Sequence, residues 1–305
     1  MTAHALRLWM ALWLGFVLSS CTDSPPLQRP AYFAPQNFSS SYVENELKTA
    51  SFLCGSQACP ENVGMIYSQM NGANLKSQLL QCTGFLVQNN IVVTNSHCVP
   101  DAIKLNGQPC QGLMAIKFIR SSGKQDIFSC RRMISFSNLN TQKISLDYAY
   151  FEIAASGISP TVISQESVSD RQKIKVIKVN PNEKGGTLVT ELCEVGLSSP
   201  MNFFGAKPWT KNNIAVLCQS SLGNSGSPVF NESNKVIGVL QSAYTQAQLD
   251  EVRRLAPPEI RVPERLSAHF IWTNLACVPH PLTGMYAEDK CEDLYQSSAD
   301  DWMTF

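Results

Sequence analysis

The chain has 305 residues and a formal net charge of zero, and only 16% of its residues are charged. This balance creates no positive field for phosphate backbones, so we expect no nucleic-acid binding. Phosphate-binding and dinucleotide-binding glycine motifs are absent, and the sequence predicts neither a cofactor nor a metal.

Residues 1–20 have the pattern of an export signal. A cation at Arg7 precedes the apolar run Leu8–Leu18, which is shorter than the ~20 residues that span a bilayer. Small residues follow, and Leu-Ser-Ser-Cys ending at Cys21 resembles a bacterial lipobox, which implies a lipid on Cys21 and membrane attachment. The alternative is an ordinary cleaved signal followed by a free cysteine.

Residues 21–50 are rich in proline and serine, which predicts a flexible tether of about thirty residues with a reach of roughly 30 Å. A spacing role and simple disorder both remain open. We expect an exported protein on the bacterial cell envelope, as a lipoprotein at the outer membrane or periplasmic face, with secretion as the alternative.

Short apolar or alternating runs separated by turn residues predict an all-β fold. The expected strands are Val63–Tyr67, Leu79–Val87, Ile91–Thr94, Met114–Ile119, Ile127–Ile134, Tyr148–Ile153, Lys173–Val179, Thr187–Val195, Ala215–Cys218 and Val236–Tyr244. The length suits two small β-barrels over 51–156 and 157–278, followed by an acidic C-terminal extension over 279–305. We expect a monomer.

Three residues whose side chains can act in acid–base or nucleophilic catalysis follow in order along the chain. His97 stands just after the predicted hairpin that ends at Thr94, and Asp147 precedes an apolar strand, with Asp126 as its rival. Ser225 lies in Gly-Asn-Ser-Gly-Ser-Pro, a glycine turn that can expose a hydroxyl while backbone N–H groups converge on an oxyanion. A Gly-Ser turn without chemistry is the alternative for this last motif.

The order His97, Asp147, Ser225, with Cys82 sixteen positions before Cys98, resembles the trypsin/chymotrypsin-like serine peptidases from about residue 62 to residue 278. The glycine turn is similar to that of the bacterial branch containing the glutamyl endopeptidases. The resemblance implies two six-stranded antiparallel β-barrels of the chymotrypsin-like kind, with a catalytic cleft between them.

The resemblance also implies the roles of the residues. Ser225 would be the nucleophile, His97 the general base and acid, and Asp147 the carboxylate that orients the imidazole, while the N–H groups of Gly223 and Ser225 would form the oxyanion hole. The expected activity is a serine endopeptidase acting on proteins or peptides. A catalytically silent binding module is the alternative, and an esterase is a smaller one.

Asn224 replaces the aspartate that receives the new N-terminal ammonium in vertebrate trypsins, and a neutral amide cannot form that ion pair. We therefore expect an oxyanion hole that forms without such an insertion, although an inhibitory partner or another activating cleavage stays open. The predicted specificity pocket has no carboxylate at its floor, which argues against an Arg or Lys preference. Leu240 stands where glutamyl endopeptidases carry a histidine, so a small or medium neutral side chain is expected. The pocket residues are Gln219, Ser220, Gln241, Ser242 and Ala243.

Eleven cysteines are present, and assigning Cys21 to lipid leaves ten for five disulfides, as suits an oxidising compartment. The resemblance implies the pairs Cys82–Cys98 and Cys193–Cys218. Cys110–Cys130 fits across a hairpin, while Cys54–Cys59 and Cys277–Cys291 follow only from sequential order. Zinc binding at the first of these sequential pairs is a disfavoured alternative, because no histidine is nearby.

Overall fold

The structure is a computed structural model that describes residues 42–55, 59–71, 77–104, 107–137, 147–164, 169, 171–195, 213–218, 223–243, 254, 270–275 and 278. These residues all belong to one compact unit, 38–305. The predicted signal, the lipidation site Cys21 and the C-terminal extension 279–305 lie outside the described residues. Within the described residues, no helix has the length and apolar character needed to cross a bilayer.

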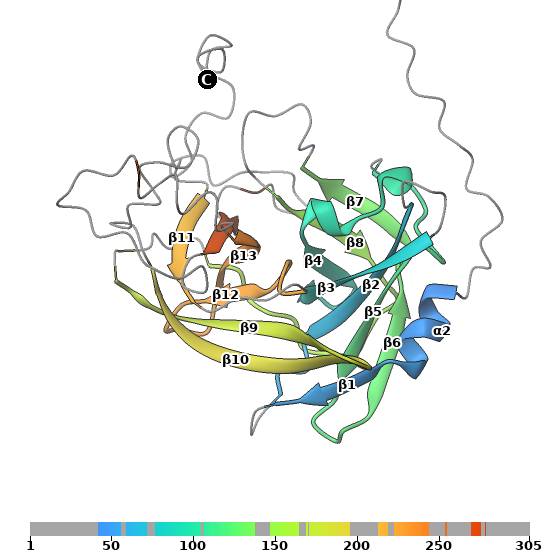
Figure 1. Cartoon of the computed structure of the whole chain (residues 1–305), viewed down its shortest axis with the longest axis horizontal. Coiled ribbons are helices and arrows are strands. Elements are labelled where there is room, and N and C mark those ends of the chain that lie inside the picture. The colour runs from blue at the N-terminus through green and yellow to red at the C-terminus, as the bar shows by residue number, and fades with distance from the viewer. Residues whose placement is uncertain are drawn as a thin grey trace, which may run out of the picture. The chain divides into compact units, whose positions relative to one another are not determined.

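The first sheet has seven strands in the order β6-β5-β2-β3-β4-β8-β7, all antiparallel (Figure 1). Its strands are β2 (Val63–Asn71), β3 (Ser77–Gln88), β4 (Ile91–Thr94), β5 (Met114–Ile119), β6 (Gln125–Ser129), β7 (Arg132–Phe136) and β8 (Ala149–Glu152). The predicted strand Ile127–Ile134 is in fact two strands. The chain leaves β5 at Cys130, whose N–H donates to Met114 O, and joins β8 at Arg131, whose N–H donates to Glu152 O.

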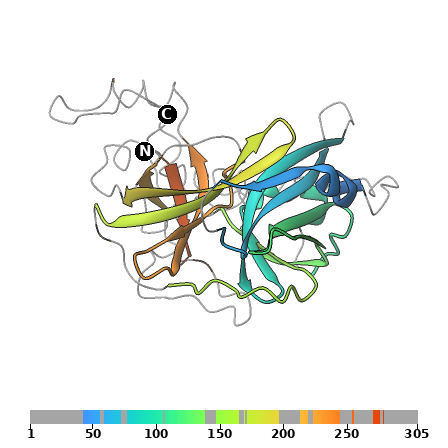
Figure 2. The same ribbon diagram turned by 90° about the horizontal axis from the view of Figure 1, so that it is seen from below.

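The second sheet also has seven strands, and six of them close a ring in the order β9-β10-β11-β14-β13-β12-β9. Its strands are β1 (Ser51–Cys54), β9 (Lys173–Asn182), β10 (Gly185–Val195), β11 (Asn213–Leu217), β12 (Pro228–Phe230), β13 (Val236–Ala243) and β14 (Phe270–Asn274). Figure 2 shows this sheet beside the first. The predicted chymotrypsin-like all-β fold is confirmed, with seven strands in each sheet where six were expected.

The N-terminal segment of the described chain contacts both sheets. Helix α2 (Tyr42–Thr49) buries Val43 and Leu47, which lie one helical turn apart and form its apolar face. The Lys117 ammonium on β5 donates to Leu47 O and Ala50 O, both at 2.7 Å, and so satisfies carbonyls at the helix C-terminus. Residues 42–50, predicted as tether, are therefore folded because this helix finds an apolar and polar partner on β5.

Strand β1, which was expected in the first barrel, pairs in parallel with β10 of the second. The same short segment thus joins the helix on the first sheet to the edge of the second. An apolar cluster also joins the barrels, because Met65 and Phe85 of the first belong to the same cluster as Val179 and Val239 of the second. This shared cluster fixes one barrel against the other, so polar side chains of the two barrels can lie at a defined distance from each other.

Candidate active site

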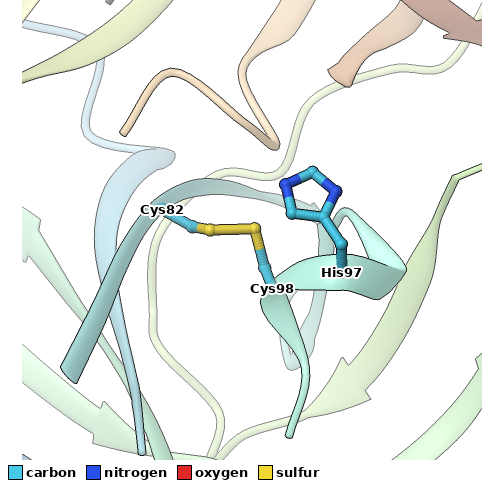
Figure 3. A group of neighbouring side chains, drawn as sticks. All are labelled: Cys82, His97 and Cys98. Carbon is cyan, nitrogen blue, oxygen red and sulfur yellow. A yellow bond between two sulfur atoms is a disulfide. The ribbon is translucent and has the colours of Figure 1, made fainter. Parts of the chain in front are cut away.

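His97 is held in place by the turn that follows β4. The strand ends at Thr94, and the 3-10 turn η1 (Ser96–Cys98) carries the histidine. A disulfide with a Cα–Cα distance of 6.3 Å joins Cys98 to Cys82 on β3. Figure 3 shows His97 and Cys98 on the same turn, with the imidazole beside the disulfide. The turn cannot move away from β3 without breaking this bond.

Asp147 binds His97 through both carboxylate oxygens. The distance from His97 Nδ1 to Asp147 Oδ2 is 2.5 Å, and the main-chain N–H of His97 donates to Asp147 Oδ1 at 3.2 Å. An ionised carboxylate can only accept, so in a neutral imidazole that faces it the ring proton belongs to Nδ1 and Nε2 is the acceptor. The carboxyl side chain is only 8% exposed, whereas the histidine is 36% exposed. This arrangement orients an imidazole for proton transfer at its outer nitrogen.

Two polar side chains before the histidine hold the segment that carries Asp147. Asn95 is fully buried, and its amide donates to the main-chain oxygen of Asp147 at 2.6 Å. Ser96 donates to Ser137 O at 2.7 Å, and the Ser137 N–H in turn donates to Tyr148 O at 2.9 Å. Neither Asn95 nor Ser96 was among the residues that the sequence motifs indicated. Their signal was two adjacent polar residues directly after a buried apolar strand.

The rival carboxylate, Asp126, lies elsewhere on the first sheet. Its two oxygens bind Arg120 Nε at 2.7 Å and Lys124 Nζ at 2.8 Å. Hydrogen bonds from Lys124 and Arg120, together with the attraction of their charges, lower the pKa of Asp126 below its usual value. Asp126 therefore stabilises the β5–β6 hairpin, and the carboxylate in contact with His97 is that of Asp147.

The Ser225 turn docks against the strand that carries Cys82. The N–H of Thr83 on β3 donates to Ser225 O at 2.7 Å, and the N–H of Gly226 donates to Leu240 O at 2.8 Å. Gly226 has φ +86°, and a Cβ there would lie 1.9 Å from Thr83 O. Only glycine permits both this conformation and this close approach. The turn is thus joined to β3 one residue from the disulfide that anchors the His97 turn.

Asn224 is buried beneath the turn at 1% exposure. Its amide group donates to Val179 O and to Asn180 Oδ1 on β9, both at 3.0 Å. The main-chain oxygen of Asn224 accepts from the Ser227 hydroxyl at 2.6 Å. Asn224 is therefore bound by strand β9 of its own barrel.

The predicted pocket is described only in part. Gln241 is buried on β13, and Ser242 and Ala243 continue that strand, pairing with Ile271 and Phe270 of β14. Gln219 and Ser220 lie outside the described residues. Leu240 is 1% exposed and belongs to the apolar cluster of the second barrel. Its side chain is packed in the interior and offers no polar group that could bind an acidic substrate side chain.

The described chain contains four disulfides. They are Cys54–Cys59, Cys82–Cys98, Cys110–Cys130 and Cys193–Cys218, with Cα–Cα distances of 5.8, 6.3, 5.3 and 5.3 Å. Cys277 and Cys291 lie outside the described residues. Among the residues that the structure describes, two groups could hold a metal ion by their spacing, one at Cys82, His97 and Cys98 and one at Glu191, Cys193 and Cys218. Both contain a disulfide, whose sulfurs are not the thiolates that bind metal.

The sequence and the fold were compared with known proteins. The model of the family described as Trypsin matches residues 56–254. A search of curated protein sequences gives no match. Similar solved structures include the Rv3671c protease from M. tuberculosis in its active form, with 17% identity, a TM-score of 0.45 and coverage of 75% of this chain and 87% of that one. The inactive Ser343Ala mutant of Rv3671c has 17% identity, a TM-score of 0.44 and coverage of 70% and 82%.

Proposed function

The chain belongs to the trypsin family, and from this premise we propose that it is an active serine endopeptidase that uses Ser225, His97 and Asp147. The observation that carries the proposal is the two-point contact between His97 and the Asp147 carboxylate, at 2.5 and 3.2 Å. This contact supports an imidazole in the tautomer that can accept a proton at Nε2. The Ser225 turn is bonded to β3, and the His97 turn is linked to the same strand by a disulfide.

In the proposed reaction, His97 Nε2 takes the hydroxyl proton of Ser225 while Ser225 Oγ attacks the carbonyl carbon of the scissile peptide bond. The N–H groups of Gly223 and Ser225 donate to the oxyanion of the tetrahedral intermediate. The imidazolium then gives its proton to the leaving amine, and an acyl-enzyme remains. A water molecule, deprotonated by the same nitrogen, then attacks the acyl carbon. The bond between that carbon and Ser225 Oγ breaks, the imidazolium returns its proton to Oγ, and the carboxylic acid product leaves.

We further propose that the oxyanion hole forms without an N-terminal ammonium. In the vertebrate trypsins, which the chain resembles, the N-terminal ammonium forms an ion pair with the residue before the nucleophile. Here the amide of Asn224 has two acceptors on β9, supplied by Val179 and Asn180. Neutral hydrogen bonds within one barrel would serve the same purpose and are present in the unprocessed chain.

The four disulfides and the family indicate an exported or extracellular protein, since cytosolic thiols stay reduced. Lipidation of Cys21 and attachment to the cell envelope are part of the proposal and rest on the lipobox pattern. Mass spectrometry of the N-terminal peptide tests them. A diacylglyceryl adduct on Cys21 is the expected result, and an unmodified cysteine would contradict it.

The activity is tested by labelling the full-length oxidised protein with a fluorophosphonate probe. Wild type should be labelled, whereas Ser225→Ala and His97→Ala should not. Peptide amide and simple ester substrates of the same acyl group then separate an endopeptidase from an esterase. A folded wild-type protein without labelling would contradict the proposal and favour a binding module.

A further inference from the structure

Thr83 links the strand next to the histidine turn to the turn that carries Ser225. It lies on β3 directly after Cys82, is fully buried, and pairs with Met65 of β2. A polar residue at this depth needs partners for its hydroxyl. No sequence motif singled out this threonine, but in the structure it takes part in four hydrogen bonds.

All four bonds of Thr83 involve residues around the candidate active site. Its N–H donates to Ser225 O at 2.7 Å, and its hydroxyl donates to Gly223 O at 3.0 Å. The hydroxyl also accepts from the Val179 N–H at 3.2 Å, and the main-chain oxygen accepts from the Thr94 hydroxyl at 2.8 Å. Because Val179 has only a hydrogen to offer, the hydroxyl proton of Thr83 must point to Gly223.

These bonds restrain the two residues whose N–H groups form the proposed oxyanion hole. Gly223 has φ +89° and no side chain, so its backbone is intrinsically free to rotate. The Thr83 hydroxyl binds its carbonyl and so fixes the peptide plane between Gly223 and Asn224. This restrains rotation at the Cα of Gly223, the atom next to its N–H. The Ser225 carbonyl is bound by the Thr83 main chain. One residue of the first barrel thus holds both ends of the oxyanion segment.

Thr83 is also anchored on the histidine side. Thr94 ends β4, three residues before His97, and its buried hydroxyl holds the carbonyl of Thr83. Val179, which donates to the Thr83 hydroxyl, also accepts from the Asn224 amide. The bonds therefore run continuously from the end of β4 through Thr83 to the turn of the second barrel.

We propose that the hydroxyl of Thr83 is a positioning group for the oxyanion hole, which sets the Gly223 N–H relative to Ser225. This inference rests on the proposed serine peptidase function. Thr83 touches no reacting atom, so its loss should weaken binding of the transition state and leave substrate binding nearly unchanged.

The test compares Thr83→Val, which keeps the shape and removes the hydroxyl, with Thr83→Ser, which keeps the hydroxyl. Ser156→Ala is the matched control, because Ser156 is also a buried residue whose hydroxyl donates to a main-chain oxygen, that of Asn89 at 2.8 Å. The control lies in the connection between the barrels. For each protein, kcat, KM, the inhibition constant of a peptide boronic acid and the melting temperature are measured, with active sites titrated by the fluorophosphonate.

Thr83→Val should lower kcat about 10- to 100-fold with KM within about twofold, and weaken boronate binding by a similar factor. Thr83→Ser should remain within about threefold of wild type, and Ser156→Ala should lose thermal stability without this loss of kcat. Equal kcat for Thr83→Val and Ser156→Ala, or equal losses for the valine and serine variants, would overturn the inference. If Thr83→Val does not fold, Thr83→Ala is judged by the same criteria, because its smaller side chain leaves room for water to reach Gly223 O and Val179 N.

The result separates this inference from the proposed function. A wild-type protein that is labelled and active, with an unaffected valine variant, overturns only the role of Thr83. A folded wild type that is neither labelled nor active overturns the proposed function and this inference with it.

Discussion

Replacing Asp147 with asparagine removes one charge from the candidate site and keeps the size of the side chain. In the wild type, the two carboxylate oxygens accept from the ring and from the main chain of His97. An amide has only one acceptor oxygen, and the main-chain N–H requires it. The amide nitrogen then faces Nδ1, which must act as an acceptor, so the ring proton moves to Nε2. In that tautomer the imidazole cannot take the proton of Ser225.

We expect Asp147→Asn to lower kcat about 10⁴-fold, which corresponds to about 5.5 kcal/mol of lost transition-state stabilisation, with a small change in KM. The assay is hydrolysis of a chromogenic peptide substrate found by profiling the wild type, with enzyme concentration corrected for folded protein by circular dichroism. Binding of substrate should survive, because the Asp147 carboxylate is buried and contacts the inner nitrogen of His97, Nδ1.

Asp126→Asn is the matched control. It makes the same chemical change on the same sheet and disturbs the contacts with Arg120 and Lys124. Its kcat should stay within about twofold of wild type, since Asp126 does not touch His97. A kcat for Asp147→Asn close to wild type, or an equal loss in both variants, would refute the assignment of Asp147 as the orienting carboxylate.

Three further changes test the packing around the site. Gly226→Ala places a Cβ at 1.9 Å from Thr83 O, on a residue with φ +86°. It should therefore lower the free energy of unfolding by about 3 kcal/mol or more and abolish probe labelling. An unchanged midpoint of urea denaturation would contradict this. Burial lowers the pKa of Lys117, so the unfolded chain binds this proton more tightly than the folded one. The free energy of unfolding should therefore rise with pH until the pH reaches the pKa of the unfolded lysine, near 10.5. Urea titrations should show that Lys117→Met loses this rise, and an identical pH dependence in both proteins would argue against it. The lowered pKa of Asp126 contributes stability, about 1 kcal/mol relative to Asp126→Asn, that is fully present above the unfolded value near 3.8 and is lost as pH falls through the lowered value. A difference between the two proteins that is unchanged from about pH 6 to about pH 2 would count against the ion pairs.

Local patterns in the sequence were sufficient for most of the strands. Ile91–Thr94 and Met114–Ile119 have the predicted bounds, because continuous apolar runs between turn residues leave little choice of structure. Strand β12 is three residues long and was not predicted, since its apolar pattern is too short to detect. Helix α2 was missed because its two buried apolar residues follow a proline- and serine-rich stretch, and only the partner on β5 makes the helix stable.

The sequence by itself determined which residue types could carry the chemistry, because the histidine, the carboxylate and the glycine-flanked serine each stand in a recognisable local context. It did not determine what holds them in place. Thr83 and Gly223 are 140 positions apart, and Asn95 and Asp147 are 52 apart. A local pattern can mark such residues, as the two polar residues after β4 do, but it does not identify their partners, since the partner of a buried polar group is chosen by how distant segments pack. Tertiary structure therefore showed that the carboxylate of Asp147, and not that of Asp126, contacts His97, and it alone decided that the Thr83 hydroxyl supports the turn of Ser225.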